Sequence, residues 1–312
     1  MISALALSPS LDVTYVVEAL EGIQRPLSTH RVAGGKALNA ARAASALGAR
    51  VSAVAVLGGG AGQDVAAGAR ADGVDLHVVP GEPTRSCVSV FAQDTGRLTE
   101  IYERAVPVSV SAAAAAVDAA VRLAASRPGW WLVSGGLPAS APAGLLADVV
   151  GRLRDAGARV AVDSHGAALR GAVEARPDLV KVNRAEALEL VGGGEEQAAP
   201  ELLAAVHERT GGLVVITDGA AGAWGTDGER VLRATLTGHT GGFPVGSGDS
   251  FLGGLLVALD GGSDLAGALS LATAAGTANA QVPGAAILDP ALTRTLTSQV
   301  EITASPGSPR RT

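Results

Sequence analysis

Short apolar segments alternate with amphipathic segments along most of this chain, most regularly from residue 111 onward. Hydrophobic residues at helical spacing predict helices at 111–126, 142–156, 184–191 and 199–210. Short apolar runs predict strands at 131–134, 160–163, 179–182 and 213–217. This alternation is typical of a parallel sheet covered by helices on both faces. The predicted fold class is therefore α/β.

The same alternation begins near the start of the chain, where two β-rich segments interrupt it. A strand at 2–7, a helix at 37–47 and a strand at 51–57 fit the pattern. The β-rich segments, about 11–33 and 85–106, are expected to form a small β lid over a site at the carboxyl ends of the parallel strands. Helices at 248–259 and 263–281 complete one domain over 1–304, and residues 305–312 are expected to be a disordered tail.

Composition narrows the class of partner. Hydrophobic residues make up 47% of the chain and charged residues 17%, which is typical of a folded globular protein. Aromatic residues make up only 3% and the net charge is −6, which disfavours nucleic-acid binding. The apolar run at 251–259 is far shorter than the roughly 20 residues of a membrane helix, and the start lacks the basic region of a signal peptide. We expect a cytoplasmic protein with a small-molecule ligand and no membrane partner. Cys87, the single cysteine, is expected to be a buried structural thiol.

The sequence Gly246-Ser247-Gly248-Asp249-Ser250 precedes an apolar helical segment. Small residues at a helix start leave backbone N–H groups free, and these groups, with the helix dipole, favour binding of an anion such as phosphate. A carboxylate there fits a group that accepts a proton from an attacking hydroxyl. The alternative is that Asp249 or Ser247 only caps the helix.

Lysine is rare in this chain: of its 24 basic residues, only Lys36 and Lys181 are lysines. Ammonium and guanidinium groups are not interchangeable at a tight site, so these two positions are candidate ligand contacts. Other nucleotide and metal motifs are absent from the sequence: it has no intact Gly-x-x-x-x-Gly-Lys-[Ser/Thr] or Gly-x-Gly-x-x-Gly loop after a strand, and no zinc motif.

Three ordered motifs give the chain a family resemblance. They are Ala33-Gly34-Gly35-Lys36-x-x-Asn39, Asn183-x-x-Glu186 and Gly246-Ser247-Gly248-Asp249. Together they resemble the signature of the ribokinase-like (phosphofructokinase B) sugar kinases over residues 2–300. Within that family, four further segments resemble the 1-phosphofructokinase and tagatose-6-phosphate kinase branch: Ser8 to Asp12, Thr84 to Cys87, Ser134 to Pro138 and Pro244 to Ser250. The resemblance implies a three-layer α/β/α fold with a mostly parallel central sheet and a small β lid.

The resemblance also implies roles at the phosphate end of the site. Asp249 would be the catalytic base, with a pKa kept low by the helix terminus, and the N–H groups of Gly246, Ser247 and Gly248 would form the anion hole. ATP and Mg²⁺ are the expected co-substrate and metal. Glu186 would act in the magnesium and phosphate network, through water. The nucleotide would be bound by Lys181, Asn183, Thr217, Gly219, Gly222 and Asn279; Asn279, expected near the base, could equally be an ordinary helix surface position.

On the sugar side, the implied contacts are Asp12, Gly34, Gly35, Lys36 and Asn39. Arg85 distinguishes the substrates, because a guanidinium offers a substrate phosphate two hydrogen bonds and offers a neutral sugar little. Arg104 is a further candidate cation. Ala37, Ser8 and Phe243-Pro244 depart from the usual pattern, which affects the identity of the sugar more than the chemistry.

The resulting prediction is a kinase that converts fructose 1-phosphate to fructose 1,6-bisphosphate. Tagatose 6-phosphate is the alternative substrate, and a neutral sugar or nucleoside fits Arg85 less well. A sugar-phosphate or nucleotide-binding sensor and a nicotinamide-dependent oxidoreductase are alternatives from other classes. A homodimer formed through the lid is a further expectation.

Overall fold

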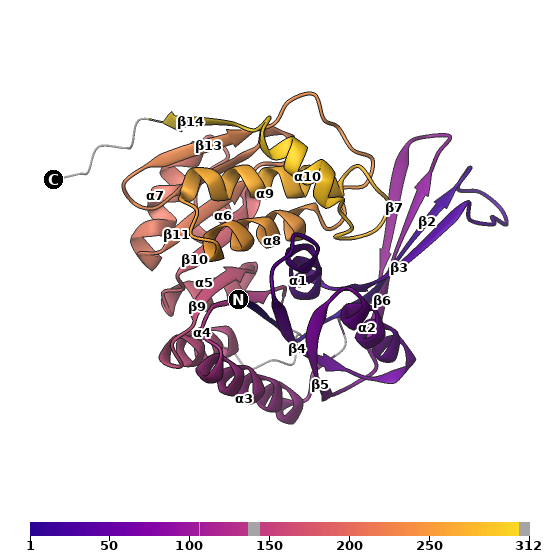
Figure 1. The fold of residues 1–312 in the computed structure, drawn as a ribbon, viewed down its shortest axis with the longest axis horizontal. Coiled ribbons are helices and arrows are strands. Elements are labelled where there is room, and N and C mark those ends of the chain that lie inside the picture. Colours follow the sequence, from indigo (N-terminus) through magenta and orange to yellow (C-terminus); the bar gives the residue numbers. More distant parts are fainter. Residues whose placement is uncertain (106, 137–143, 306–312) are drawn as a thin grey trace.

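The computed structural model describes residues 1–105, 107–136 and 144–305. In these residues ten strands form one sheet, in the order β14-β13-β12-β11-β10-β9-β8-β1-β4-β5 (Figure 1). Strands β1, β4, β5 and β8 to β11 are parallel to their neighbours in this run, whereas β12, β13 and β14 continue the sheet in antiparallel pairs. The parallel strands are β1 (Ile2–Ala6), β4 (Val51–Leu57), β5 (Val74–Pro80), β8 (Trp130–Ser134), β9 (Arg159–Asp163), β10 (Leu179–Asn183) and β11 (Leu213–Thr217). The antiparallel strands are β12 (Ala223–Thr226), β13 (Val231–Thr235) and β14 (Glu301–Ser305).

Helices cover both faces of this sheet, because its strands are apolar on both sides. Along β1, Ile2 and Ala4 pack into one core and Leu5 into the other. The first core holds α1 (Lys36–Ala46), α2 (Gly59–Ala71), α8 (Ser247–Asp260) and α9 (Leu265–Asn279), with α10 (Pro290–Thr297) packed on α9. The second holds α3 (Val110–Ser126), α4 (Leu145–Asp155), α5 (Gly166–Glu174), α6 (Arg184–Val191) and α7 (Ala199–Thr210). The predicted three-layer α/β fold with a mostly parallel sheet is confirmed.

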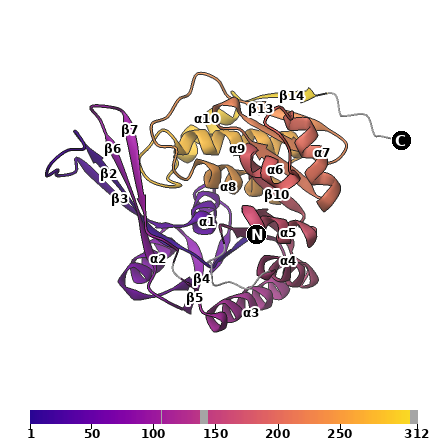
Figure 2. The same cartoon turned by 180° about the vertical axis from the view of Figure 1, so that it is seen from behind.

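A separate four-stranded sheet projects from the body (Figures 1 and 2). Its order is β3-β2-β6-β7, built from β2 (Ser10–Val17), β3 (Ser28–Gly34), β6 (Arg85–Ala92) and β7 (Arg97–Tyr102). The outer pairs are antiparallel and the central pair, β2 and β6, is parallel. The two β-rich segments expected in the lid therefore do form one small sheet.

Several elements go beyond the sequence-based expectation. Helix α5 follows the strand expected at 160–163; it has only nine residues, two of them glycine, so its apolar stripe at Leu169, Ala172 and Val173 is short. Strand β14 ends at Ser305, the first residue of the expected tail, and 306–312 lie outside the described residues. Within the described ranges, none of the helices is both long and apolar enough to span a membrane.

Candidate active site

A cavity of about 690 Å³ lies between the small sheet and the carboxyl ends of the parallel strands. The strand registers align the ends of neighbouring strands at one side of this cavity: Ser134 pairs with Asp163, and Asn183 pairs with Thr217. Predicted site residues that line the cavity are Asp12, Gly35, Lys36, Asn39, Arg85, Lys181, Asn183, Thr217, Gly246, Gly248 and Asp249. Other predicted residues lie outside the lining: Gly34, Arg104, Glu186, Gly219, Gly222, Ser247 and Asn279.

Asp249 lies in the first turn of α8 and is 9% exposed. Its Oδ2 accepts a hydrogen bond of 2.9 Å from Nδ2 of Asn39, on the neighbouring helix α1. Burial, and then the charge of Asp163, raise the pKa of Asp249 to about 7, against the lowering effects of Asn39, Lys36 and Lys181. The expectation that the helix terminus keeps this pKa low is therefore wrong.

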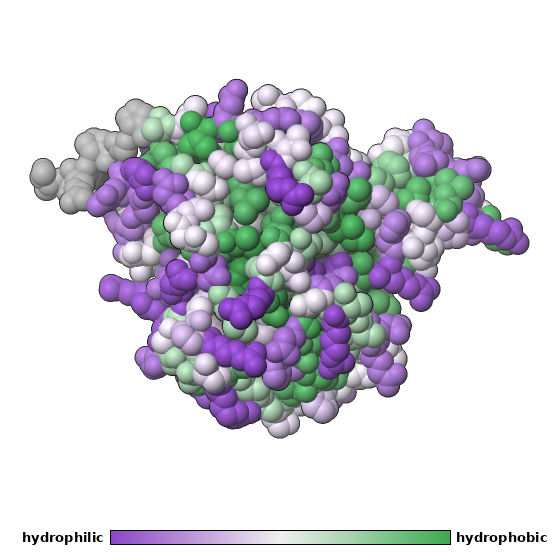
Figure 3. Space-filling view, in the orientation of Figure 1, coloured by the Kyte–Doolittle hydropathy of each residue, from purple (hydrophilic) through white to green (hydrophobic). Residues whose placement is uncertain are grey.

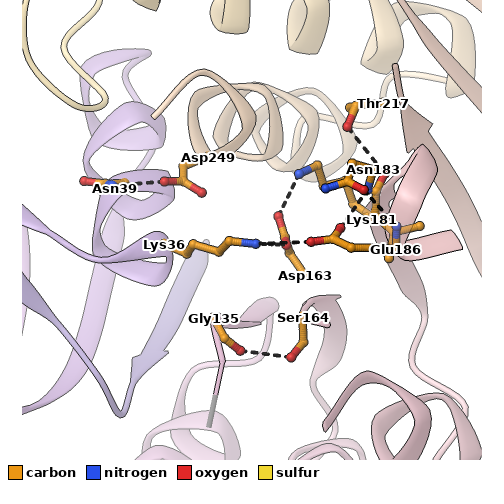
Figure 4. Close-up of polar contacts among 11 residues, drawn as sticks. Lys36, Asn39, Gly135, Asp163, Ser164, Lys181, Asn183, Glu186, Thr217 and Asp249 are labelled. Atoms are coloured by element: carbon orange, nitrogen blue, oxygen red, sulfur yellow. Dashed lines mark hydrogen bonds and ion pairs between the residues drawn. The ribbon is translucent and has the colours of Figure 1, made fainter. Parts of the chain in front are cut away.

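The two lysines converge on one buried carboxylate (Figure 4). Asp163, at the end of β9, is fully buried; its Oδ1 accepts from Lys36 Nζ at 3.0 Å and its Oδ2 from Lys181 Nζ at 2.8 Å. Burial would raise the pKa of Asp163, but the two ammonium groups hold it below its usual range. Burial would likewise lower the pKa of Lys36, yet Asp163 and Glu186 hold it above its usual range. Both ammonium groups thus contact one carboxylate, and both lysines line the cavity.

Glu186 and Asn183 form a capping box at the start of α6. The Asn183 Oδ1 accepts from the N–H of Glu186 at 2.8 Å, and the Glu186 Oε2 accepts from the N–H of Asn183 at 2.8 Å. The remaining oxygen, Oε1, lies 3.8 Å from Lys36 Nζ. One carboxylate thus both fixes the helix start and adds negative charge beside Lys36.

The glycines before α1 allow the backbone to pass close to Asp12 and to the segment Ser8-Pro9. A Cβ on Gly34 would lie 2.1 Å from the Asp12 carboxyl carbon, so any larger residue would displace that carboxyl group. Gly35 has φ of 89° and is the residue before the first turn of α1. The Oδ1 of Asp12 accepts from Ser10 Oγ at 2.6 Å, and burial raises the pKa of Asp12.

Arg85 reaches the cavity from the start of β6. Its Nη1 donates to the Glu103 carbonyl at 3.1 Å, while its buried Nε has no hydrogen-bond partner among the described residues. The guanidinium therefore retains donors for a ligand. Arg104, predicted beside it, is exposed and outside the cavity lining.

The loop before α8 differs from the prediction at one position. Gly246 has φ of 81°, and a Cβ there would lie 2.4 Å from the Ala286 nitrogen, so glycine is required. The Ser247 N–H donates to the Pro244 carbonyl at 3.0 Å and is not available to an anion, which corrects the expectation for this residue. The N–H groups of Gly246 and Gly248 have no acceptor within the described parts of the chain.

Of the residues expected to bind a nucleotide beyond α6, only Thr217 lines the cavity. The Thr217 hydroxyl donates to the Val182 carbonyl at 3.4 Å at the cavity edge. Gly219 begins the short turn Gly219–Ala221 and Gly222 follows it. Asn279 is fully buried beneath the loop before α8, neither on a helix surface nor facing the cavity.

Two residues of this region were not among the predicted site residues. Asp163 lies outside the cavity lining, and its position between two lysines depends on packing that the sequence does not reveal. His165 lines the cavity, where a Cβ on Gly136 would lie 2.9 Å from its ring. Cys87 is buried as predicted; burial raises the pKa of its thiol.

The three-layer α/β fold, the small second sheet and the cavity between the two sheets define a ribokinase-like fold. A model of the pfkB family carbohydrate kinases matches residues 8–292, and the chain belongs to this family. It is therefore a phosphotransferase that acts on a sugar hydroxyl, with ATP as co-substrate. Membership of this kinase family argues against both alternatives from other classes, the nicotinamide-dependent oxidoreductase and the binding sensor.

Solved structures agree on the fold. Phosphofructokinase-2 from Escherichia coli in complex with potassium is 24% identical with a TM-score of 0.88, covering 95% of this chain and 98% of that one. The same E. coli protein in complex with fructose-6-phosphate gives 23% and 0.85, with the same coverage. A protein described as a possible 1-phosphofructokinase, from Thermotoga maritima, is 17% identical with a TM-score of 0.84, covering 98% of this chain and 100% of that one.

Proposed function

We propose that this kinase phosphorylates a hexose phosphate, with fructose 1-phosphate as the preferred substrate and its 6-hydroxyl as the acceptor. The observation that carries the proposal is Arg85, whose guanidinium lines the cavity with donors that the described residues leave unused. A phosphate would accept two parallel hydrogen bonds from such a group. Tagatose 6-phosphate is the second candidate, because it also carries a phosphate at one end and a primary hydroxyl at the other.

In the proposed mechanism Asp249 accepts the proton of the attacking hydroxyl. Its oxygen Oδ2 is held by Asn39, which orients the carboxylate toward the cavity. The N–H groups of Gly246 and Gly248 would stabilise negative charge on the phosphoryl group. Lys181 would neutralise the nucleotide phosphates, and Lys36 would contact an anionic group on the substrate side. Transfer requires alignment and charge neutralisation, which these preorganised groups would supply.

The residues fit a Mg²⁺ ion that is held largely by the nucleotide. Within the described ranges no cluster of three or more His, Cys, Asp or Glu side chains could hold a metal. Both oxygens of Asp163 are bonded to lysines, whereas Glu186 keeps Oε1 free of hydrogen bonds from backbone groups. Mg²⁺ commonly uses one or two carboxylates, waters and substrate phosphates. We propose that Glu186 holds it through water; the ion would neutralise charge on the transferring phosphoryl group.

A substrate panel tests the proposal. We expect kcat/KM to be highest for fructose 1-phosphate when it is compared with tagatose 6-phosphate, fructose 6-phosphate, fructose and ribose by coupled detection of ADP. Arg85→Ala should lower kcat/KM for the phosphorylated substrate by about 10–100-fold and leave the free sugars nearly unchanged. Arg97→Ala, which removes an exposed arginine of the same small sheet, is the matched control. A preference for free sugars, or an Arg85→Ala variant with unchanged kcat/KM, would contradict the proposal.

We also propose that the small sheet joins two copies of the chain. Large apolar side chains are exposed on it and on the connection between β2 and β3: Leu20, Ile23, Leu27 and Ile101. Figure 3 shows hydrophobic residues at the surface of this projecting part. The similarly folded E. coli phosphofructokinase-2 is described as tetrameric in its inhibited form, which is compatible with self-association.

A further inference from the structure

Asn279 is a fully buried amide directed at the loop that precedes α8. It is the last residue of α9 and has no exposed surface. Its Nδ2 lies 2.9 Å from the Val245 carbonyl, 3.0 Å from the Ser247 hydroxyl oxygen and 3.3 Å from the Phe243 carbonyl. Its Oδ1 accepts a long hydrogen bond of 3.4 Å from Ser250. One side chain thus contacts four residues of the loop and the helix start.

Three oxygens converge on a nitrogen that carries two hydrogens. Without that nitrogen the Phe243 and Val245 carbonyls would face each other with no donor between them. Leaving these part-buried carbonyls without a donor would cost up to about 1–3 kcal/mol, so we expect the loop to change shape rather than keep this arrangement. The amide of Asn279 therefore determines where these carbonyls point.

The packing of α9 against the loop leaves little room for another arrangement. A Cβ on Gly276, one turn before Asn279, would lie 3.0 Å from the Ser247 carbonyl oxygen. The Phe243 N–H donates to the Ala280 carbonyl at 3.1 Å, just after Asn279. Asn279 is thus the side chain at the centre of a close backbone contact.

This contact turns Ser247 away from the cavity. Its hydroxyl faces Asn279 and its N–H donates to Pro244, while its neighbours Gly246 and Gly248 line the cavity. We propose that Asn279 is a positioning residue for phosphoryl transfer: by holding the oxygens of residues 243, 245 and 247 it directs the N–H groups of Gly246 and Gly248 at the transferring group. This inference rests on the anion-hole role proposed for that loop.

The test separates positioning from folding. Asn279→Leu keeps a similar volume and removes the donors; we expect kcat to fall by about 10–100-fold while KM for the sugar phosphate changes by less than about threefold, since Asp12 and Arg85 do not contact Asn279. Thr273→Val is the matched control, because Thr273 is also buried on α9 and its hydroxyl has no partner in the described chain. This control should retain wild-type kcat.

A second variant gives a readout that a purely structural role would not move. The carboxyl group of Asn279→Asp can donate one hydrogen bond when protonated and none when ionised. We therefore expect the ratio of its kcat to the wild-type kcat, measured at the same pH, to rise as the pH falls. This measurement also serves if Asn279→Leu does not fold.

The outcomes are distinct. Wild-type kcat in Asn279→Leu, equal losses in Thr273→Val, or a kcat ratio for Asn279→Asp that does not change with pH would each overturn the inference while leaving the kinase intact. A wild-type enzyme that phosphorylates free sugars but no sugar phosphate would instead overturn the proposed substrate, and the kcat comparison would then be made with the sugar that is turned over.

Discussion

Asp249 is a nearly buried carboxylate close enough to a second carboxylate, Asp163, for their charges to interact. That environment gives it a pKa of about 7 in the ligand-free protein. A group that must be ionised to accept a proton will then limit turnover below neutral pH. Because kcat/KM reports the free enzyme, we expect it to rise about tenfold per pH unit below pH 7 and to level off above it.

The measurement is a profile of kcat/KM against pH, with a buffer series at constant ionic strength. Stability supplies an independent check of the same pKa. Because the folded value lies above the unfolded value of 3.8, the native state binds more protons between these pH values, and the free energy of unfolding should fall as pH rises from about 4 to 7. The Asp249→Asn variant should lose turnover, and it should also lose this contribution of Asp249 to the pH dependence of the free energy of unfolding. A flat profile down to pH 5 would contradict the assignment.

At the scale of elements, Asp163 joins three of them. It ends β9, while Lys36 begins α1 and Lys181 lies on β10. Asp163→Asn would leave Lys36 with only the Glu186 carboxylate at 3.8 Å, and it would leave the buried Lys181 with no ion-pair partner among the described residues. We expect the free energy of unfolding at pH 7 to fall by about 3–5 kcal/mol, as measured by urea denaturation.

The pKa of Asp163 predicts how the loss of stability in Asp163→Asn changes with pH. A depressed folded pKa stabilises the protein above the unfolded value of 3.8 and loses that effect as pH falls through the folded value. The gap between wild type and Asp163→Asn should therefore narrow in acid. Asp227→Asn, which breaks an exposed pair with Arg230, is the control and should cost about 1 kcal/mol or less. Equal losses of unfolding free energy in Asp163→Asn and Asp227→Asn would show that the burial of the Asp163–lysine contacts is unimportant for stability.

The elements also show what the sequence could and could not reveal. Alternation of apolar segments was enough to predict β8 to β11 and hence a row of polar strand ends at one edge of the sheet. The meeting of Lys36, Asp163 and Lys181 depends on strand order and on the position of α1, since Lys36 and Asp163 are 127 residues apart. The hydroxyl of Ser247 points away from the cavity because it contacts Asn279, and the local motif around Ser247 does not encode that contact.

At the scale of the whole molecule, the small sheet lies beside the cavity, and exposed apolar residues lie on it and on the connection between β2 and β3. Ile23 is 93% exposed and Ile101 is 63% exposed, and the outer strands β3 and β7 have free edges in the described structure. Apolar side chains so placed gain about 1.5–3 kcal/mol each when fully buried, which favours self-association. We therefore expect the wild-type chain to be a dimer in light-scattering chromatography.

Replacing Ile23 or Ile101 with Asp should raise the dimer dissociation constant by about 10–100-fold, because a carboxylate would then have to be desolvated in the interface. Val110→Asp, at an exposed apolar position on α3 away from the small sheet, should leave the dimer intact. Asp12 and Arg85 belong to the same sheet, so loss of the dimer should also raise KM for the sugar phosphate. A monomeric wild-type chain would contradict self-association, and dissociation by Val110→Asp alone would place the association surface away from the small sheet.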